Sequence, residues 1–112
     1  MQAESVDVDD YVAHISILKT LQRVFAWVRP YATWMSFYGL AWGFALASNQ
    51  DKSEFDSKAV DAILAQRGIR GLKFYDGETH RHMFSIPKYL RDALDGPSVG
   101  MIITDRELLV VQ

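Results

Sequence analysis

A chain of 112 residues has room for one domain with a single hydrophobic core. Its 12 basic and 14 acidic residues leave a formal net charge of −2, which argues against a nucleic-acid or anionic-lipid partner. The chain has no cysteine, which excludes disulfides, thiolate metal sites and a cysteine nucleophile and fits the cytoplasm. Its acidic start lacks the basic residues and the apolar run of a secretory signal, so we expect a soluble, cytoplasmic protein.

The first predicted element is a helix over residues 8–28. Apolar side chains such as Ile15 and Leu18 recur at spacings of three and four and form one broad face. Three aspartates at the start of this segment suit the positive end of the helix dipole. Pro30 is expected to end the helix, and His14 is expected on its flank as a partly exposed residue.

Residues 31–48 read YATWMSFYGLAWGFALAS, with six aromatic side chains and no charged one. Three kinds of burial are open: a membrane helix, a helix in a soluble core, or two strands joined by a turn. Aromatic residues suit strands and Gly39 supplies a turn conformation, so a hairpin with strands over about 29–36 and 41–48 is favoured. The membrane helix is the weakest alternative, because polar side chains interrupt the run and no cluster of Lys or Arg flanks it.

Beyond the hairpin the sequence predicts a polar helix with Ser53 as its N-cap and Gly68 at its end. The segment IRGLKFYD, residues 69–76, predicts a strand that ends at a turn. A short helix, a second helix opened by Pro87, and a hairpin or bent strand are expected over residues 78–84, 87–94 and 99–111. Together these elements predict an α/β fold in which helices cover a small sheet led by the hairpin.

Few residues in this chain have the spacing of a catalytic or metal site. His80 and His82 lie near Asp76 and Glu78, but residues two apart on a helix point in different directions and no histidine pair is four residues apart. A metal site is therefore not expected. The sequence also lacks the patterns of a serine triad, a P-loop or a dinucleotide-binding loop, so no self-contained enzyme is predicted from motifs.

The aromatic run and the acidic N-terminus offer another kind of site. Carboxylates can fix the ammonium groups of an aliphatic amine, while aromatic rings flank its methylene chain and add cation–π attraction. The sequence therefore allows a binding site for a cationic amine. The alternative is that the aromatic residues form ordinary core.

The segment FAWVRPYATWMSFYGLAWGFALAS resembles the polyamine aminopropyltransferases, the spermidine synthase family. Members of that family carry a helix ending in Phe, a strand, a Pro-Ser/Thr-aromatic turn and a second strand of the type W-G-F/W-x-x-A-S. The downstream GLKFYDGETHRHMFSIPKYLRDAL is similar to the family's C-terminal signature, and the closing MIITDRELLVV resembles the tail of its longer bacterial and thermospermine-type members. Two motifs in the family's order thus cover nearly the whole chain.

Gln2, Ala3 and Glu4 resemble the Q-x-E segment that follows the fifth strand of the family's Rossmann-like catalytic domain. The resemblance implies that residues 1–112 are a single partial domain, the C-terminal third of that domain, with the hairpin as strands six and seven. Strand five, the glycine-rich nucleotide loop, the acidic residue that holds the ribose and the catalytic Asp loop have no counterpart in the chain. No catalytic, cofactor-binding or metal-binding residue is therefore assigned here.

Family membership implies transfer of an aminopropyl group from decarboxylated S-adenosylmethionine to a polyamine such as putrescine. In that reaction a deprotonated amine attacks the carbon next to a sulfonium, so the amine must be aligned and must lose a proton. By resemblance, Trp42 would wall the amine pocket, Ser36 and Phe37 would form its turn, and Gln2 and Glu4 would approach the amine. The alternatives are that Trp42 is core, Ser36 shapes the turn, and Gln2 and Glu4 belong to a frayed terminus.

One departure from the family pattern concerns the turn, where Met35 replaces the usual Pro and leaves the turn less rigid. Without strand five, strand seven is expected to expose its backbone edge, which predicts a homo-oligomer or a complementary chain. Two functions remain open. The chain is either the C-terminal segment of an aminopropyltransferase, inactive alone, or a non-catalytic oligomerisation or polyamine-binding module of the same ancestry.

Overall fold

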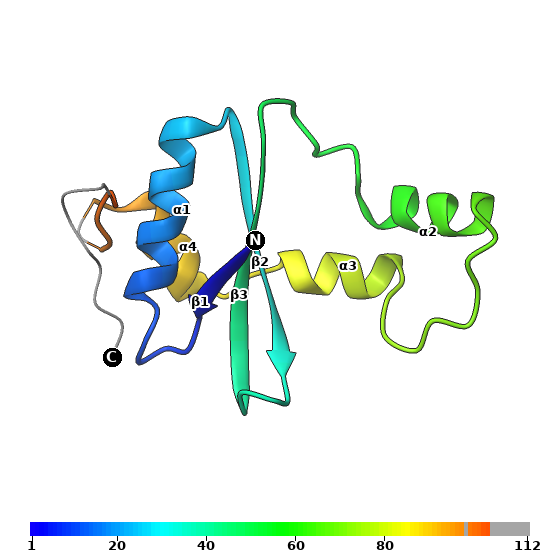
Figure 1. The fold of residues 1–112 in the computed structure, drawn as a ribbon, viewed down its shortest axis with the longest axis horizontal. Coiled ribbons are helices and arrows are strands. Elements are labelled where there is room, and N and C mark those ends of the chain that lie inside the picture. The colour runs from blue at the N-terminus through cyan, green and yellow to red at the C-terminus, as the bar shows by residue number, and fades with distance from the viewer. Residues whose placement is uncertain (98, 104–112) are drawn as a thin grey trace.

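The computed structural model of this chain describes residues 1–97 and 99–103. Three strands and four helices make up this part of the chain in a mixed α/β fold (Figure 1). In chain order they are β1 (Gln2–Ser5), α1 (Val12–Val24), β2 (Trp27–Met35), β3 (Leu40–Ser48), α2 (Ser57–Gln66), α3 (Gly77–Phe84) and α4 (Lys88–Asp95). The predicted α/β class is confirmed.

The sheet is built on the hairpin of β2 and β3, which pair antiparallel without interruption from Trp27 opposite Ser48 to Met35 opposite Leu40. Gly39 closes the turn at a φ of 71°, and its N–H donates to the carbonyl of Met35 over 3.0 Å. Glycine adopts this left-handed conformation without the steric cost of a side chain. The predicted hairpin is therefore confirmed, and the burial of the aromatic run as a helix is excluded.

The pairing of β1 with β3 corrects the expectation that strand seven has a free edge. The sheet order is β1-β3-β2, so β3 is the central strand. Gln2 lies opposite Phe44 and Ser5 opposite Trp42, and the N–H of Ala45 donates to the carbonyl of Met1 over 2.8 Å. The first residues of the chain thus cover the edge of β3 that was expected to pair with another chain. A free strand edge therefore no longer supports the prediction of self-association.

Helix α1 is shorter than the predicted helix over residues 8–28. Before it, the N–H of Asp10 donates to the carbonyl of Asp7, and the Asp7 carboxylate accepts from the N–H of Asp9, so these aspartates form a turn instead of a helix start. After it, the chain is already extended at Trp27 because pairing with β3 begins there. Pro30 therefore lies inside β2 instead of ending the helix, and β2 is an edge strand, where a missing N–H is tolerated.

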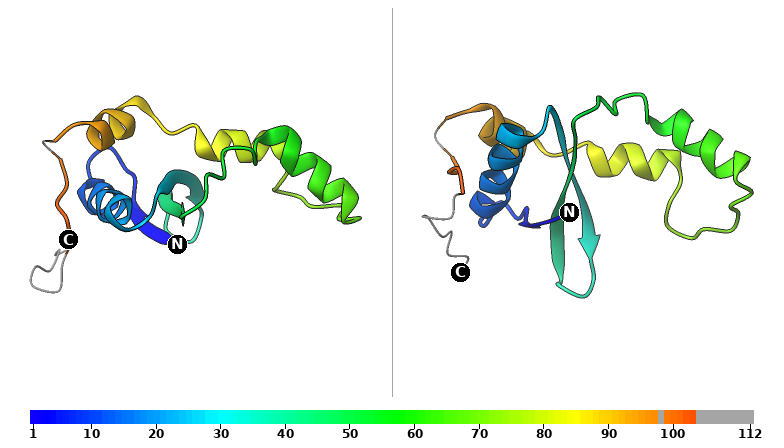
Figure 2. Two further views of the ribbon diagram at one scale, coloured as in Figure 1. Left: turned by 90° about the horizontal axis from the view of Figure 1, so that it is seen from above. Right: turned by 45° about the horizontal axis from the view of Figure 1, so that its top comes forward.

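The hydrophobic core lies between α1, α4 and the sheet, on one side of the hairpin (Figure 2). Its buried residues come from β1, α1, β3 and α4 and the segments beside them: Ala3, Val6, Ile15, Leu18, Ala45, Ile86, Leu90 and Ala93. His14 is also fully buried here, so the expectation of a partly exposed histidine is wrong. Burial is possible because its ring faces Gly43, which has no side chain to fill the space.

Helices α2 and α3 extend away from the sheet on the other side, as an arm of residues 57–84 (Figures 1 and 2). Among the described elements α2 contacts only α3, while α3 also contacts β2. The N-cap of α2 is Asp56, whose carboxylate accepts from the N–H of Ala59, so the prediction of Ser53 is wrong. Gly68 follows the helix at a φ of 66°, as expected for a C-terminal glycine.

The predicted strand over residues 69–76 is absent, and the segment forms an irregular loop. Its apolar side chains Ile69, Leu72 and Phe74 are exposed, and no strand of the described sheet lies beside it. An isolated strand leaves its backbone groups unpaired, so the apolar pattern alone could not make one here. By contrast, the predictions of helices over residues 78–84 and 87–94 are confirmed, within one residue at each end, by α3 and α4.

The described part of the C-terminal tail runs along α1. Ser16 accepts from the N–H of Met101 and Thr20 from the N–H of Ile103, both over 2.9 Å. Residues 99–103 form no strand, and the rest of the predicted tail hairpin lies outside the described residues. Within the described part of the chain, every helix is too short or too polar to cross a membrane.

Candidate functional site

The pairing of β1 with β3 brings two of the predicted site residues together at the turn end of the hairpin. The Gln2 Nε2 donates a hydrogen bond of 3.0 Å to the hydroxyl of Tyr38. The ring of Tyr38 packs on that of Trp42, with centroids 4.6 Å apart. Gln2, Tyr38 and Trp42 thus form a continuous group, which we call the amide–aromatic cluster. Tyr38 was missing from the predicted site, although it belongs to the same aromatic run.

Trp42 leaves one strong polar group unsatisfied in this cluster. Its indole Nε1 is buried, and no described residue accepts its hydrogen. A buried indole N–H almost always has an acceptor, because burying a donor without one costs about 1–3 kcal/mol. The indole N–H of Trp42 is therefore a buried donor without an acceptor among the described residues.

Glu4 lies next to this cluster in an unusual backbone conformation. Its φ is 66°, the one positive φ of a residue other than glycine in the described part of the chain. The pairing register of β1 with β3 shifts between Gln2 and Ser5, so Glu4 belongs to a β-bulge. Such a conformation costs about 1–3 kcal/mol, and strain of this kind concentrates at functional sites. A bulge also changes the direction of a side chain relative to a regular strand.

The other two predicted residues, Ser36 and Phe37, lie at the tip of the hairpin. Phe37 is 94% exposed, and its ring meets only the edge of Tyr38, at a centroid distance of 6.5 Å. Ser36 is exposed too, and its carbonyl accepts from the N–H of Gly39 in the turn. The structure therefore leaves both residues beside the cluster instead of packing them into it.

His14 supports β1 from below the sheet. Its Nδ1 lies 2.7 Å from the carbonyl oxygen of Ala3, between Gln2 and Glu4. A carbonyl can only accept, so this nitrogen carries the hydrogen. Desolvation by burial lowers the pKa of His14, against a smaller opposing effect of the bond to Ala3. A neutral, buried imidazole thus fixes the strand that carries two predicted site residues.

The other histidines do not form a metal site within the described residues, where no three candidate ligands come together. His80 uses both ring nitrogens, since its Nδ1 lies 2.7 Å from the Tyr75 hydroxyl and its Nε2 lies 3.0 Å from the Phe55 carbonyl. The carbonyl accepts from Nε2, so Nδ1 is left to accept from Tyr75. Desolvation, together with the nearby Tyr31, raises the pKa of Tyr75 and keeps it a donor.

Sequence comparison relates the chain to enzymes of polyamine metabolism. It is 46% identical over 80 residues to polyamine aminopropyltransferase 2 of Hyperthermus butylicus, a match that covers 70% of this chain and 26% of the relative. It is 35% identical over 83 residues to the polyamine aminopropyltransferase of Nitrosomonas europaea, covering 73% of this chain and 26% of that protein. No protein-family model matches the chain. The chain thus spans about a quarter of the length of these relatives.

Structural comparison shows that the fold is similar to that of spermidine synthases. The spermidine synthase of Thermotoga maritima superposes with a TM-score of 0.65 and 24% identity, over 83% of this chain and 32% of that one. A spermidine synthase in complex with the transition-state analogue AdoDATO gives a TM-score of 0.66 over 83% of this chain and 31% of that one. The three-stranded sheet and its four helices therefore match spermidine synthase structures. Over about 70% of its length, this chain is homologous to the polyamine aminopropyltransferases, the family that its motifs resemble.

Proposed function

We propose that this chain is the C-terminal segment of an aminopropyltransferase catalytic domain and supplies the amine side of its active site. The reaction would transfer an aminopropyl group from decarboxylated S-adenosylmethionine to putrescine or a related polyamine. One observation carries the proposal: in a chain homologous to these enzymes, Gln2, Tyr38 and Trp42 form a cluster that contains a buried, unpartnered indole N–H.

The cluster has the chemistry that an aliphatic diamine needs. The rings of Tyr38 and Trp42 offer faces for methylene groups and for a cationic ammonium. The amide of Gln2 donates to Tyr38 through nitrogen, which leaves its oxygen to accept from an amine. The Glu4 carboxylate, on the bulge, would pair with an ammonium group. Phe37 and Ser36 would close over the amine from the hairpin tip.

The unpartnered N–H of Trp42 fits a second feature of this proposal, namely that another segment completes the active site. It is a donor, so it would not bind an ammonium group directly. It suits a carboxylate or carbonyl contributed by a segment outside the described residues. A complementary chain that supplies the donor-binding loop and the catalytic aspartate would provide such an acceptor. We therefore expect the protein to act as part of a larger assembly, and its lack of cysteine fits the cytoplasm.

Binding of a diamine tests the site without requiring catalysis. Calorimetric titration with putrescine should show binding that weakens about 10-fold or more for 1-butylamine, which lacks the second ammonium group. Trp42→Phe, which replaces the indole by a smaller ring with weaker cation–π attraction, should weaken binding, as should Gln2→Ala. Trp34→Phe is the matched control, because Trp34 is an exposed tryptophan on β2. Equal affinities in Trp42→Phe, Gln2→Ala and the control would contradict the proposed site.

Turnover separates this function from the non-catalytic alternative. The chain alone, with decarboxylated S-adenosylmethionine and putrescine, should release no methylthioadenosine, because its sequence lacks a donor-binding loop. Addition of the complementary portion of the Hyperthermus butylicus relative should produce activity that Trp42→Phe reduces. If putrescine binds but no complement yields activity, the chain is a polyamine-binding module. Turnover by the chain alone would overturn the assignment of an incomplete site.

A further inference from the structure

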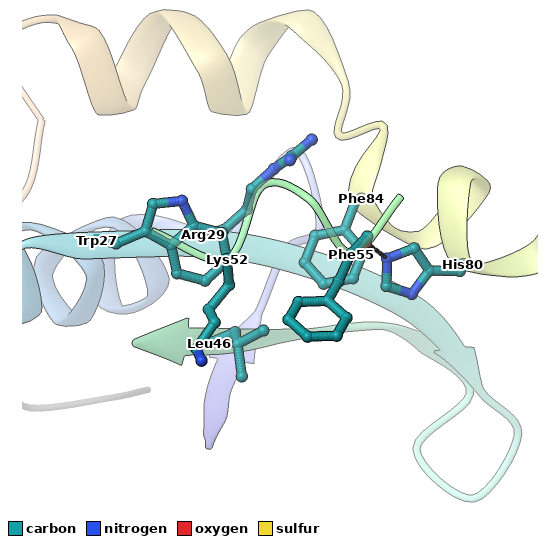
Figure 3. A pocket seen from close by; sticks show the side chains of 7 residues that line it. All are labelled: Trp27, Arg29, Leu46, Lys52, Phe55, His80 and Phe84. Carbon is teal, nitrogen blue, oxygen red and sulfur yellow. Dashed lines mark hydrogen bonds between the residues drawn. The ribbon is translucent and has the colours of Figure 1, made fainter. Parts of the chain in front are cut away.

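A cavity of about 320 Å³ lies at the base of the arm, and none of its lining residues belongs to the amide–aromatic cluster (Figure 3). It opens at the end of the hairpin opposite the turn, where β2 begins. Seven residues from β2, β3, α3 and the loop after β3 line it: Trp27, Arg29, Leu46, Lys52, Phe55, His80 and Phe84. The cavity has the size of a small-ligand site, which starts at about 300 Å³.

The walls of the cavity are aromatic and held in place. Phe84 packs against Tyr31 with a centroid distance of 4.9 Å and against His80 at 4.6 Å. The hydrogen bond from His80 to the Phe55 carbonyl ties the loop after β3 to α3. Trp27 is anchored in β2 opposite Ser48. These rings form a slot for a flat apolar group, and the slot depends on contacts between three separate segments.

Two cations border this aromatic slot. The Arg29 guanidinium carbon lies 5.4 Å from the centre of the Phe84 ring, and the Lys52 ammonium lies 5.8 Å from that of Phe55. Lys52 also donates to the amide oxygen of Gln50 over 3.1 Å. Neither cation pairs with a carboxylate in the described part of the chain, and no acidic residue lines the cavity. In a chain of net charge −2, this is a local concentration of positive charge.

We propose that this cavity binds a small aromatic carboxylate. The aromatic body would lie against the rings of Trp27, Phe55 and Phe84. The carboxylate would accept from the guanidinium of Arg29, and Lys52, whose ammonium points to the other side of the cavity (Figure 3), would add its positive charge. An arginine fork matches the two oxygens of a carboxylate, and its charge strengthens both hydrogen bonds. Both nitrogens of His80 are already engaged, so it acts as a wall. The same two cations repel a polyamine, so this site differs from the amine site in the charge of its ligand.

The experiment compares three probes of one shape and different charge. Calorimetric titration with 2-naphthoate should show binding at least 10-fold tighter than with 2-naphthalenemethanol, which is neutral. The cationic 2-naphthylmethylamine should bind more weakly still. Similar affinities for all three probes would overturn the proposal and indicate an unspecific apolar surface. Absence of 2-naphthoate binding up to millimolar concentration would overturn it as well.

Variants locate the probe in the cavity. Arg29→Gln should weaken 2-naphthoate binding about 10-fold and Lys52→Gln by a smaller factor, and neither substitution changes a buried side chain. Lys58→Gln is the matched control, because Lys58 is exposed on α2 and does not line the cavity. Leu46→Trp, which fills the slot without altering charge, should abolish binding. An unchanged affinity in the Arg29→Gln, Lys52→Gln double variant would exclude this site. Putrescine binding should stay the same in that double variant, so the two proposals fail independently.

Discussion

Helices α1 and α4 and helices α2 and α3 lie on opposite sides of the hairpin and differ in how they are buried (Figure 1). Helix α1 buries Ile15 and Leu18 completely, and α4 buries Leu90, in one core with β1 and β3. In the arm, only Val60 of α2 and Gly77 of α3 are buried. The first side is therefore held by apolar burial, whereas the arm is held by a few aromatic and polar contacts.

The arm shows which contacts substitute for a core. Phe84 packs on Tyr31 of β2, His80 bonds to the Phe55 carbonyl, and the Asp61 carboxylate accepts from the N–H of Gly77 over 2.8 Å. Hydrogen bonds of this kind contribute only about 0.5–1.5 kcal/mol each. We therefore expect the arm to open locally at a lower free energy than the core, as regions with few buried apolar contacts do.

The largest expected effect is the loss of stability when a buried apolar side chain is shortened, and we expect this loss to be greater in the core than in the arm. Leu18→Ala should lower the free energy of unfolding by about 2–5 kcal/mol, because it leaves a cavity in the core. Val60→Ala in the arm should cost about 1.5 kcal/mol or less, since it removes two carbons worth about 0.8 kcal/mol each. Urea denaturation measures both losses.

Hydrogen exchange of the backbone amides shows which elements each of these two variants destabilises. Leu18→Ala should speed exchange throughout α1, α4 and the sheet, while Val60→Ala should speed it in α2 and α3 alone. Equal losses of stability, or acceleration of the whole molecule by Val60→Ala, would show that the arm and the core unfold as one unit.

An intermediate effect tests the buried imidazole under β1. Burial lowers the pKa of folded His14 below the ordinary value of 6.5. The unfolded chain therefore binds a proton more readily, so His14 contributes full stability above pH 6.5 and loses it as the pH falls below that value. His14→Asn keeps a donor for the Ala3 carbonyl but cannot titrate in this range.

Thermal melts at pH 7.5 and 5.5 measure this contribution. The melting temperature should fall more on acidification in the natural chain than in His14→Asn, which retains the other two histidines. His14→Leu should cost about 1–3 kcal/mol at pH 7.5, because the buried Ala3 carbonyl loses its partner. Identical acid dependence in the natural chain and His14→Asn would mean that protonation of His14 does not destabilise the fold.

The smallest expected effect lies within the arm. Tyr75→Phe removes the hydroxyl that bonds to His80 and should cost about 0.5–1.5 kcal/mol. Exchange in α3 should rise while exchange in α1 stays unchanged. Tyr11→Phe is the control, because the Tyr11 ring packs on Tyr89 and its hydroxyl bonds to no other described residue. A loss as large as that of Leu18→Ala would place Tyr75 in the main cooperative unit.

Local signals explain which predictions were confirmed. The aromatic content and Gly39 predict the hairpin, because strand preference and turn geometry are encoded within a few residues. Helix α4 follows from Pro87 at its start in the same way, whereas Asp76, which caps α3, was interpreted as the end of a strand. The prediction of a strand over residues 69–76 was wrong, because an apolar pattern of this kind fits either a strand or a loop. No neighbouring strand of the described sheet pairs with these residues.

The residues of the candidate site were identified partly from the sequence and partly from the tertiary structure. The resemblance of its motifs singles out Gln2 and Trp42, and the sequence comparison confirms the family behind that resemblance. Tyr38 was missed because nothing local indicates that Gln2, 36 residues away, bonds to its hydroxyl. The roles of Glu4, Ser36 and Phe37 stay predictions, which putrescine binding by substituted chains can test.

By itself, the sequence determined the hairpin, the class of fold and the family, since these follow from local preferences and from motifs read in order. Only the tertiary structure decided that β1 covers the edge of β3, that His14 is buried beneath it, and that Arg29 and Lys52 border one aromatic cavity. The physical reason is the same in each case. These features are contacts between segments far apart in the chain. Such contacts stabilise the fold only after the segments have come together, so no local sequence pattern indicates them.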